Sequence, residues 1–141
     1  MNDSVEVRLL GPLDAAVLNT VAAEVFDNAI DPALASEFLS DRRHHLVVAL
    51  IDDEVVGIAS AVHYVHPDKP TELWINEVGV GSAHRGKGIG RQLIDAILAR
   101  GRELGAEEAW LGTEEDNTAA RALYAAAGGK EERMLYITFK L

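Results

Sequence analysis

Apolar and polar residues recur along this chain with two periods, and these predict six strands and four helices. Alternating or β-branched runs predict strands at residues 5–9, 46–51, 55–62, 72–80, 107–111 and 135–139. Apolar residues at helical spacing predict helices at residues 12–28, 31–42, 89–104 and 117–127. Asp31 followed by Pro32 is typical of a helix start, and Asp52, Asp53 and Glu54 between two strands indicate a hairpin.

The order of these elements, β-α-α-β-β-β-α-β-α-β, favours one fold class. It predicts an α+β domain with a central mixed, mostly antiparallel β-sheet flanked by about four helices. The chain has 141 residues, which is enough for one two-layer core and too few for two. Because the pattern contains no repeat, linker or low-complexity tract, we expect residues 1–141 to form a single domain.

Charge and cysteine usage narrow the possible partners. The chain carries 23 acidic and 13 basic residues, for a formal net charge of -10. Such a charge repels nucleic-acid phosphates and attracts cations such as polyamines, although it can also serve solubility alone. The absence of cysteine excludes disulfides, thiolate zinc sites and a cysteine nucleophile, and it fits a reducing cytoplasm. The sequence has no apolar run of about 20 residues and no signal peptide, so we expect no membrane partner.

A glycine-rich basic turn follows the strand that ends at Val80. It contains three glycines at alternate positions (Gly86, Gly88, Gly90) and begins the helix at residue 89. Glycines leave backbone N–H groups open to close approach, and a helix N-terminus adds free donors and a partial positive charge. Arg85, Lys87 and Arg91 add positive charge to an otherwise acidic protein. The turn therefore predicts a phosphate site, the alternative being a solvated loop.

Two familiar nucleotide motifs fit this turn poorly. Residues 81–87 have the spacing G-x-x-x-x-G-K of a P-loop, but Gly88 stands where a Ser or Thr would bind magnesium. The dinucleotide spacing G-x-G-x-x-G is broken because His84 follows Gly79 and Gly81 without the third glycine.

The turn fits another signature better, R/Q-x-x-G-x-G/A, through Arg85, Gly88 and Gly90. Further on, residues 117–124 have the pattern N-x-x-A-x-x-L-Y. With both segments and the matching element order, nearly the whole chain resembles the GNAT superfamily of N-acetyltransferases. Residues 72–80, with His84 and Arg85, are also similar to the aminoglycoside 3-N-acetyltransferases of the gentamicin type.

The resemblance implies acetyl-CoA as co-substrate, no metal, a small-molecule amine as the other substrate, and a homodimer. It also implies that the strand before the turn splays from its neighbour and holds the pantetheine arm through its main chain. The residues expected to contact the cofactor are Val78, Gly79, Val80, Arg85, Gly86, Lys87, Gly88, Ile89, Gly90, Arg91 and Asn117.

Two residues are candidates for the chemistry. At Glu77 the resemblance places an acidic residue, which can accept the proton of the attacking amine or only bind the substrate ammonium. Glu72 is the weaker candidate, because five residues along a regular strand reverse the face. Tyr124 is expected to protonate the departing CoA sulfur, the alternative being an ordinary core tyrosine. Asn117 caps the helix, contacts the pantetheine, or does both.

The function implied is acetyl transfer to a primary amine of a small cationic molecule such as an aminoglycoside. Two alternatives are acetylation of a peptide or protein amine, and a non-catalytic acyl-CoA-binding module. The presence of both Glu77 and Tyr124 argues against the module, because a pure binder needs neither.

Overall fold

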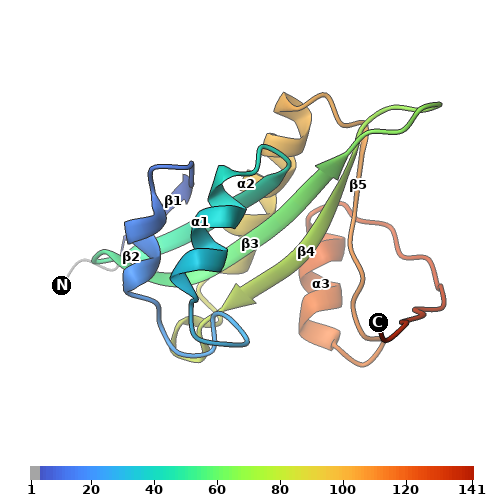
Figure 1. The fold of residues 1–141 in the computed structure, drawn as a ribbon. Coiled ribbons are helices and arrows are strands. Elements are labelled where there is room, and N and C mark those ends of the chain that lie inside the picture. Colours follow the sequence, from blue (N-terminus) through green and yellow to red (C-terminus); the bar gives the residue numbers. More distant parts are fainter. Residues whose placement is uncertain (1–3) are drawn as a thin grey trace.

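Five strands form one sheet in the computed structural model of the protein, which describes residues 4–141 (Figure 1). Their order in the sheet is the order in the chain, β1-β2-β3-β4-β5. The first four are antiparallel, and β5 lies parallel to β4, so the predicted mixed, mostly antiparallel α+β sheet is confirmed. The strands are β1 (Glu6–Leu9), β2 (His44–Ile51), β3 (Glu54–Tyr64), β4 (Glu72–Val80) and β5 (Glu108–Trp110).

Three α-helices occur in the described part of the chain, together with two short 3₁₀ turns, where the sequence predicted four helices. They are α1 (Pro32–Ser40), α2 (Ile89–Glu103) and α3 (Thr118–Ala126), with η1 (Ala15–Asn19) and η2 (Ser82–His84). Helix α2 and helix α1 lie on opposite faces of the sheet (Figure 1). Each face therefore has its own core.

The two cores follow from the alternation of apolar side chains along β2. Val47 and Ala49 pack with α2 residues such as Leu93, whereas Val48 and Leu50 pack with the segment before β2. Because successive side chains of a strand point to opposite faces, a continuous apolar strand fits a sheet that is covered on both sides.

Local signals account for the elements that were predicted well. Asp31 accepts hydrogen bonds from the N–H groups of Ala33 and Leu34, and Pro32 occupies the first turn of α1. Between β2 and β3, Asp52 (φ 49°) and Asp53 (φ 64°) both have positive φ, as a two-residue hairpin turn requires.

The helix predicted at residues 12–28 is wrong: only η1 forms there. The Asp14 carboxylate accepts a hydrogen bond from the N–H of Gly11, and such local bonds compete with a helix. Farther on, Thr20 and Ala22 hydrogen-bond to both backbone groups of Val55 at the start of β3. Tertiary pairing thus replaces the helix, and the segment becomes an irregular loop over the sheet.

The strand predicted at residues 135–139 is also wrong. No helix or strand is present among residues 127–141, and all of residues 128–141 are exposed. Alternation describes the side chains of a strand, but a strand also needs a neighbour for its backbone, and this segment pairs with no strand of the described chain. His44 and His45, which lie between the predicted helix at residues 31–42 and the predicted strand at residues 46–51, begin β2.

No helix within residues 4–141 is long and apolar enough to cross a membrane.

Candidate functional site

A β-bulge in β4 determines which side chains reach the candidate site. Ser60 of β3 pairs with Glu77, whereas the next residue, Ala61, pairs with Ile75, so Asn76 is an extra residue in β4. The bulge reverses the alternation along the strand. Ile75 and Val78 both pack in the core under α2, and Glu77 points to the opposite face. The expectation that Glu72 and Glu77 lie on opposite faces is therefore wrong.

Glu72 nevertheless does not line the cavity described below, and its carboxylate hydrogen-bonds to the Nε2 atom of His66.

Strands β4 and β5 separate after a short parallel pairing. Only residues 72–74 of β4 pair with residues 108–110 of β5. Beyond Trp74 the two segments of the chain diverge, as expected for the splayed strand that the resemblance implies. A cavity of about 580 Å³ opens between them. It is lined by Glu24, Val25, Asp27, Ile75, Asn76, Glu77, Val78, Gly79, Val80, Arg85, Leu111, Gly112, Thr113, Asn117, Ala119 and Tyr124.

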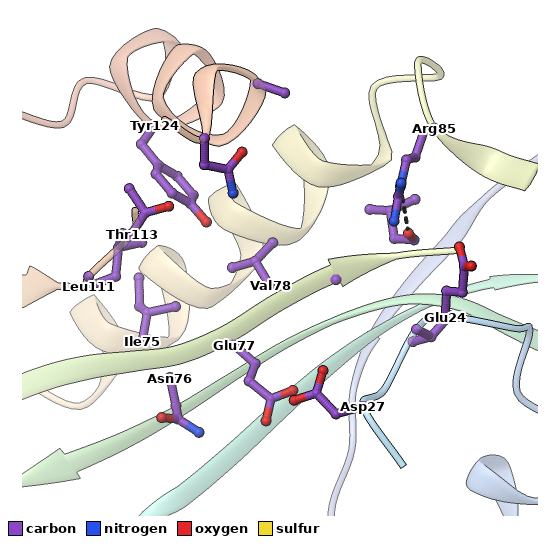
Figure 2. A pocket seen from close by; sticks show the side chains of 16 residues that line it. Glu24, Asp27, Ile75, Asn76, Glu77, Val78, Arg85, Leu111, Thr113 and Tyr124 are labelled. Atoms are coloured by element: carbon purple, nitrogen blue, oxygen red, sulfur yellow. Dashed lines mark hydrogen bonds between the residues drawn. The ribbon is translucent and has the colours of Figure 1, made fainter. Parts of the chain in front are cut away.

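The acidic side of this cavity contains Glu77 and two residues of the loop before α1. Figure 2 shows the carboxyl groups of Glu77 and Asp27 facing one another, with Glu24 farther along the same loop. Burial raises the pKa of the Glu77 carboxyl above its ordinary value, and the negative charge of Asp27 raises it further. A carboxylate with a raised pKa is a better proton acceptor near neutral pH than an ordinary one.

Tyr124 and Asn117 line the opposite side of the cavity from helix α3. The ring of Tyr124 points from α3 into the cavity, with its hydroxyl end on the side of Val78 (Figure 2). Burial raises the pKa of the Tyr124 hydroxyl, so it remains protonated and able to donate. Asn117 caps α3 by accepting a hydrogen bond from the N–H of Ala120, and it also lines the cavity.

The glycine turn lies at the start of α2, where Arg85 joins it to the cavity. Gly86 (φ 78°) and Gly88 (φ 79°) both have left-handed backbone angles, and beyond the adjoining backbone no atom lies within 4 Å of a Cβ placed on either. The turn is thus open on its outer side, and the first N–H groups of α2 have no acceptor within the helix. Arg85 donates from its Nε to the carbonyl oxygen of Val80. These features fit the binding of a diphosphate.

The other expected cofactor residues differ in how they can contribute. The exposed side chain of Lys87 lies within reach of His84, and Arg91 pairs with Asp95 on α2 at 3.0 Å, which offsets part of its charge. The side chain of Ile89 is buried in the core, so only its main chain can face a ligand.

Two glycines have packing reasons that the sequence did not reveal. A Cβ on Gly79 would lie 2.6 Å from the carbonyl oxygen of Val25, so the loop before α1 crosses β4 here. A Cβ on Gly90 would lie 3.1 Å from Leu123, so Gly90 lets α3 approach α2.

Sequence reasoning missed the contribution of the loop before α1. Glu24, Val25 and Asp27 fell within the wrongly predicted helix, and nothing in their spacing indicates that they meet β4. The lining residues 111–113 were assigned to the end of a strand and its turn. The resemblance contained a signal for residues 111–113, because a gap between two splayed strands is lined on its other side by the residues that follow the second strand.

A splayed strand pair beside an open, basic helix start suits a ligand with a long arm and a diphosphate. Glu77 and Tyr124, an acid–base pair across the cavity, suit acyl transfer. That combination defines the class of acyl-CoA-dependent transferases. The family model described as Acetyltransferase (GNAT) family matches residues 16–128, and the chain belongs to this family. It is an acetyl-CoA-dependent N-acetyltransferase rather than a nucleotide hydrolase or a non-catalytic module.

Named relatives agree with this assignment. N-alpha-acetyltransferase RimI of Mycobacterium tuberculosis (strain ATCC 25618 / H37Rv) is 31% identical over 130 residues, covering 89% of this chain and 78% of that protein. An aminoglycoside acetyltransferase from an uncultured soil metagenomic sample, in complex with sisomicin, has a TM-score of 0.81 at 19% identity, covering 97% of this chain and 96% of that chain.

Aminoglycoside N-acetyltransferase AAC(6')-Iy in complex with CoA has a TM-score of 0.78 at 20% identity, covering 100% of this chain and 98% of that chain. At such identities the likeness of the two solved structures shows the fold. The narrower resemblance to 3-N-acetyltransferases is not supported by these neighbours, since the second of them is of the 6' type.

Proposed function

We propose that this enzyme transfers an acetyl group from acetyl-CoA directly to a primary amine of a small cationic molecule. One observation carries the proposal: the carboxylates of Glu77 and Asp27 face one another in the cavity across from Tyr124, and a third, Glu24, lines the cavity farther along the same loop. Several negative charges around one small cavity favour a substrate with more than one ammonium group. An aminoglycoside, the class of ligand bound in the metagenomic relative, is the first acceptor to test.

The proposed place of the co-substrate is along β4 and the glycine turn. Gly81 donates its N–H to Val56 of β3, and the carbonyl oxygen of Val80 instead accepts from Arg85. By the alternation of a strand, the main-chain groups of Val78 and Val80, on either side of Gly79, face the gap left by β5 and can hydrogen-bond an amide-containing arm. The N–H groups at the start of α2, with Arg85 and Lys87, would hold the diphosphate. The thioester supplies the acetyl group and a thiolate leaving group.

The side chains of the cavity then divide the proton transfers. Glu77 accepts a proton from the substrate amine, directly or through a water, as the amine nitrogen bonds to the acetyl carbon. Tyr124 donates its hydroxyl proton to the sulfur as the carbon–sulfur bond breaks. Asp27 and Glu24 hold a second ammonium group of the acceptor. A substrate that enters as an ammonium ion loses two protons in becoming an amide, through Glu77, and the sulfur gains one from Tyr124. Glu77 passes one proton back to Tyr124 through solvent and releases the other, so protons and charge balance over the complete reaction.

A second candidate acceptor is the amine of a peptide or protein. The observation that favours it is the 31% identity to RimI, named an N-alpha-acetyltransferase. A peptide N-terminus is also a primary amine, but it brings one ammonium group to a cavity with three carboxylates. We further propose that residues 1–141 work as one domain, in the cytoplasm, and as a pair of copies.

An amine panel tests the proposal. CoA release would be followed with sisomicin and other aminoglycosides, polyamines, lysine peptides and peptides with a free N-terminus, each with acetyl-CoA. We expect kcat/KM for a polycationic small molecule to exceed that for every peptide by at least about tenfold, or about 1.4 kcal/mol. Preference for a peptide would favour the second candidate, and no CoA release with any amine would refute both.

A further inference from the structure

A group of aromatic side chains lies on the face of the sheet that carries Glu77. The side chain of Ile75 lies in the core under α2, so the ring of its neighbour Trp74 points to the opposite face. Trp110 of β5 pairs with Trp74, and the two ring centroids lie 4.1 Å apart. Nε1 of Trp110 donates a hydrogen bond of 2.9 Å to the hydroxyl of Tyr64 on β3. Tyr64, Trp74 and Trp110 therefore form one unit, which we call the aromatic platform.

The platform adjoins the cavity where β4 and β5 separate. Nε1 of Trp74 donates to Oδ1 of Asn76 at 3.3 Å, and a Cβ on Gly112 would lie 3.8 Å from the ring of Trp74. Asn76 and Gly112 both line the cavity, the first from β4 and the second from the segment after β5. Glu77 follows Asn76, and three residues of strand span about 10 Å. A ligand about 10 Å long could therefore contact both Glu77 and the platform.

The rings of the platform are partly open to solvent. Helix α1 covers the β2 side of this face, where Phe38 stacks on His44, and the β3–β4 hairpin extends beyond it (Figure 1). Trp110 is 37% exposed, and Tyr64 and Trp74 are half-buried. Aromatic pairs across strands stabilise a sheet without any ligand. Partly exposed aromatic rings beside a cavity are, in addition, typical of the walls of a ligand site.

Hydrogen bonds and ring contacts hold the platform in one arrangement. The two indole N–H groups are bonded to Asn76 and Tyr64, and the ring of His66 meets that of Tyr64 edge-on at 5.1 Å. His66 is held in turn by Glu72. Because the rings are fixed before a ligand arrives, binding costs little side-chain entropy.

The chemistry of the platform favours a cationic ligand. The faces of tryptophan and tyrosine rings attract an ammonium group within about 6 Å of their centroids. The carboxylates of Glu77 and Asp27 in the adjoining cavity attract ammonium groups as well. An acceptor built of linked rings with several amines suits both places, since one amine can lie at Glu77 while a second ring lies over the platform.

We propose that the aromatic platform is an outer subsite for the acceptor, which binds a second, ammonium-bearing ring while the reacting amine lies at Glu77. The proposal rests on the proposed function and narrows the acceptor class to polyamines of linked rings. A short linear diamine reaches the cavity alone. No bond forms or breaks at the platform; its rings position the acceptor.

Tryptophan fluorescence tests the subsite directly. The chain has two tryptophans, and both belong to the platform. Sisomicin, added to the enzyme with saturating CoA, should change their emission in a saturable way, and putrescine, a linear diamine, should not. An emission that sisomicin leaves unchanged, or that putrescine changes equally, would overturn the proposal. Because this titration needs no turnover, it decides the subsite even if the amine panel releases no CoA.

A pair of variants tests the role of the ring faces. Trp110→Leu keeps apolar bulk but removes the aromatic face, whereas Trp110→Phe keeps a ring and is the matched control. Cation–π contacts change binding by roughly two- to thirtyfold. We expect Trp110→Leu to raise the Kd and the KM for sisomicin about tenfold, and to leave kcat, the KM for putrescine and acetyl-CoA affinity unchanged. Trp110→Phe should bind sisomicin nearly as well as the wild type.

The same variants separate ligand binding from sheet stability. A Trp110→Leu enzyme with a lower Tm and the sisomicin affinity of the wild type would show that the rings serve the sheet alone, and would overturn the proposal. Should Trp110→Leu fail to fold, Tyr64→Leu on β3 replaces it. We expect Tyr64→Leu to weaken sisomicin binding severalfold by calorimetry, with acetyl-CoA affinity unchanged. Wild-type affinity for sisomicin in this variant would overturn the proposal as well.

Discussion

At the scale of single residues, the environment of Glu77 sets what its carboxylate can do. The group opens onto the cavity, yet surrounding protein and the facing Asp27 both raise its pKa. A general base is most effective when its pKa approaches the working pH. The same two causes that destabilise the ionised carboxylate therefore suit it to accept a proton from an amine.

Replacing Glu77 with glutamine removes the basicity and keeps the size. We expect turnover to fall by the ~10²–10⁴ typical of a general base, with acetyl-CoA affinity unchanged and a smaller loss at high pH, where more amine is already neutral. Glu72→Gln is the matched control, since Glu72 lies on the same face of β4 but outside the cavity. Should Glu77→Gln raise only the KM for amine, Glu77 is a substrate anchor instead.

Replacing Asp27 with asparagine tests the coupling of the two carboxylates. The charge of Asp27 raises the pKa of Glu77, so its removal should lower that pKa. The acidic limb of kcat/KM against pH, where Glu77 must lose its proton to act, should then move to lower pH. A limb at the same pH in the variant and the wild type would show that the two groups do not interact during catalysis.

At the scale of elements, the sequence predicted those that depend on local chemistry. The capped start of α1, the β2–β3 hairpin and the glycine turn each have their determinants within a few residues. The failures depend on distant partners. Residues 20–22 hydrogen-bond to Val55 at the start of β3, far away in the sequence. The bulge at Asn76 can be recognised only from the pairing of β4 with β3. The last predicted strand would need the edge of another strand, which the periodicity of its own side chains does not supply.

The glycine turn offers a test at this scale. Gly88→Val would strain the backbone, because a β-branched residue tolerates a φ of 79° poorly, so it confounds binding with folding. Asparagine tolerates this region better. We expect Gly88→Asn to weaken acetyl-CoA binding by at least about tenfold, since its side chain occupies the open approach to the first N–H groups of α2.

Gly105→Asn is the matched control for this variant. Gly105 has a similar φ of 80° and open space around its Cβ, but it lies after the other end of α2. The acetyl-CoA affinity of the Gly105→Asn variant, measured by calorimetry, should equal that of the wild type. Equal affinities of both variants and the wild type would refute the diphosphate site.

At the scale of the whole molecule, one buried histidine links the sheet to the helix behind it. His45 on β2 is 3% exposed; Arg100 of α2 donates to its Nδ1, and its Nε2 lies 2.7 Å from Nδ1 of His63 on β3. The neutral ring thus carries its proton on Nε2. Burial, followed by the charge of Arg100, lowers the pKa of His45 to about 4.

This linkage predicts how the stability of the fold depends on pH. An unfolded histidine has a pKa near 6.5, so between about pH 6.5 and 4 the unfolded chain binds one more proton at this residue. Stability should therefore fall as the pH falls through this window, by at most about 3 kcal/mol from His45. Urea unfolding at pH 7 and 4.5 should show a smaller loss for His45→Gln than for the wild type. Equal losses would exclude His45 as a cause.

The candidate site was predictable from the sequence only where its residues lie in local motifs. Glu77, Tyr124, Asn117 and Arg85 lie in sequence segments that resemble the family, and all four line the cavity. The acidic loop residues Glu24 and Asp27 reach it only through tertiary folding, in a segment whose pattern indicated a helix. Local motifs therefore identify the residues proposed to face the co-substrate, whereas the acidic residues proposed to face the acceptor depend on tertiary folding.

The early separation of β4 and β5 bears on how such enzymes can diverge. A ligand arm that occupies the place of a missing strand is held by peptide groups, which every residue supplies alike. Substitutions along this edge of β4 can then change most side chains without loss of co-substrate binding. Under the proposed function, acceptor choice would depend instead on the side chains of the irregular loop before α1, where replacements disturb no ladder of hydrogen bonds. New substrates can thus evolve on one side of the cavity while the other side stays fixed.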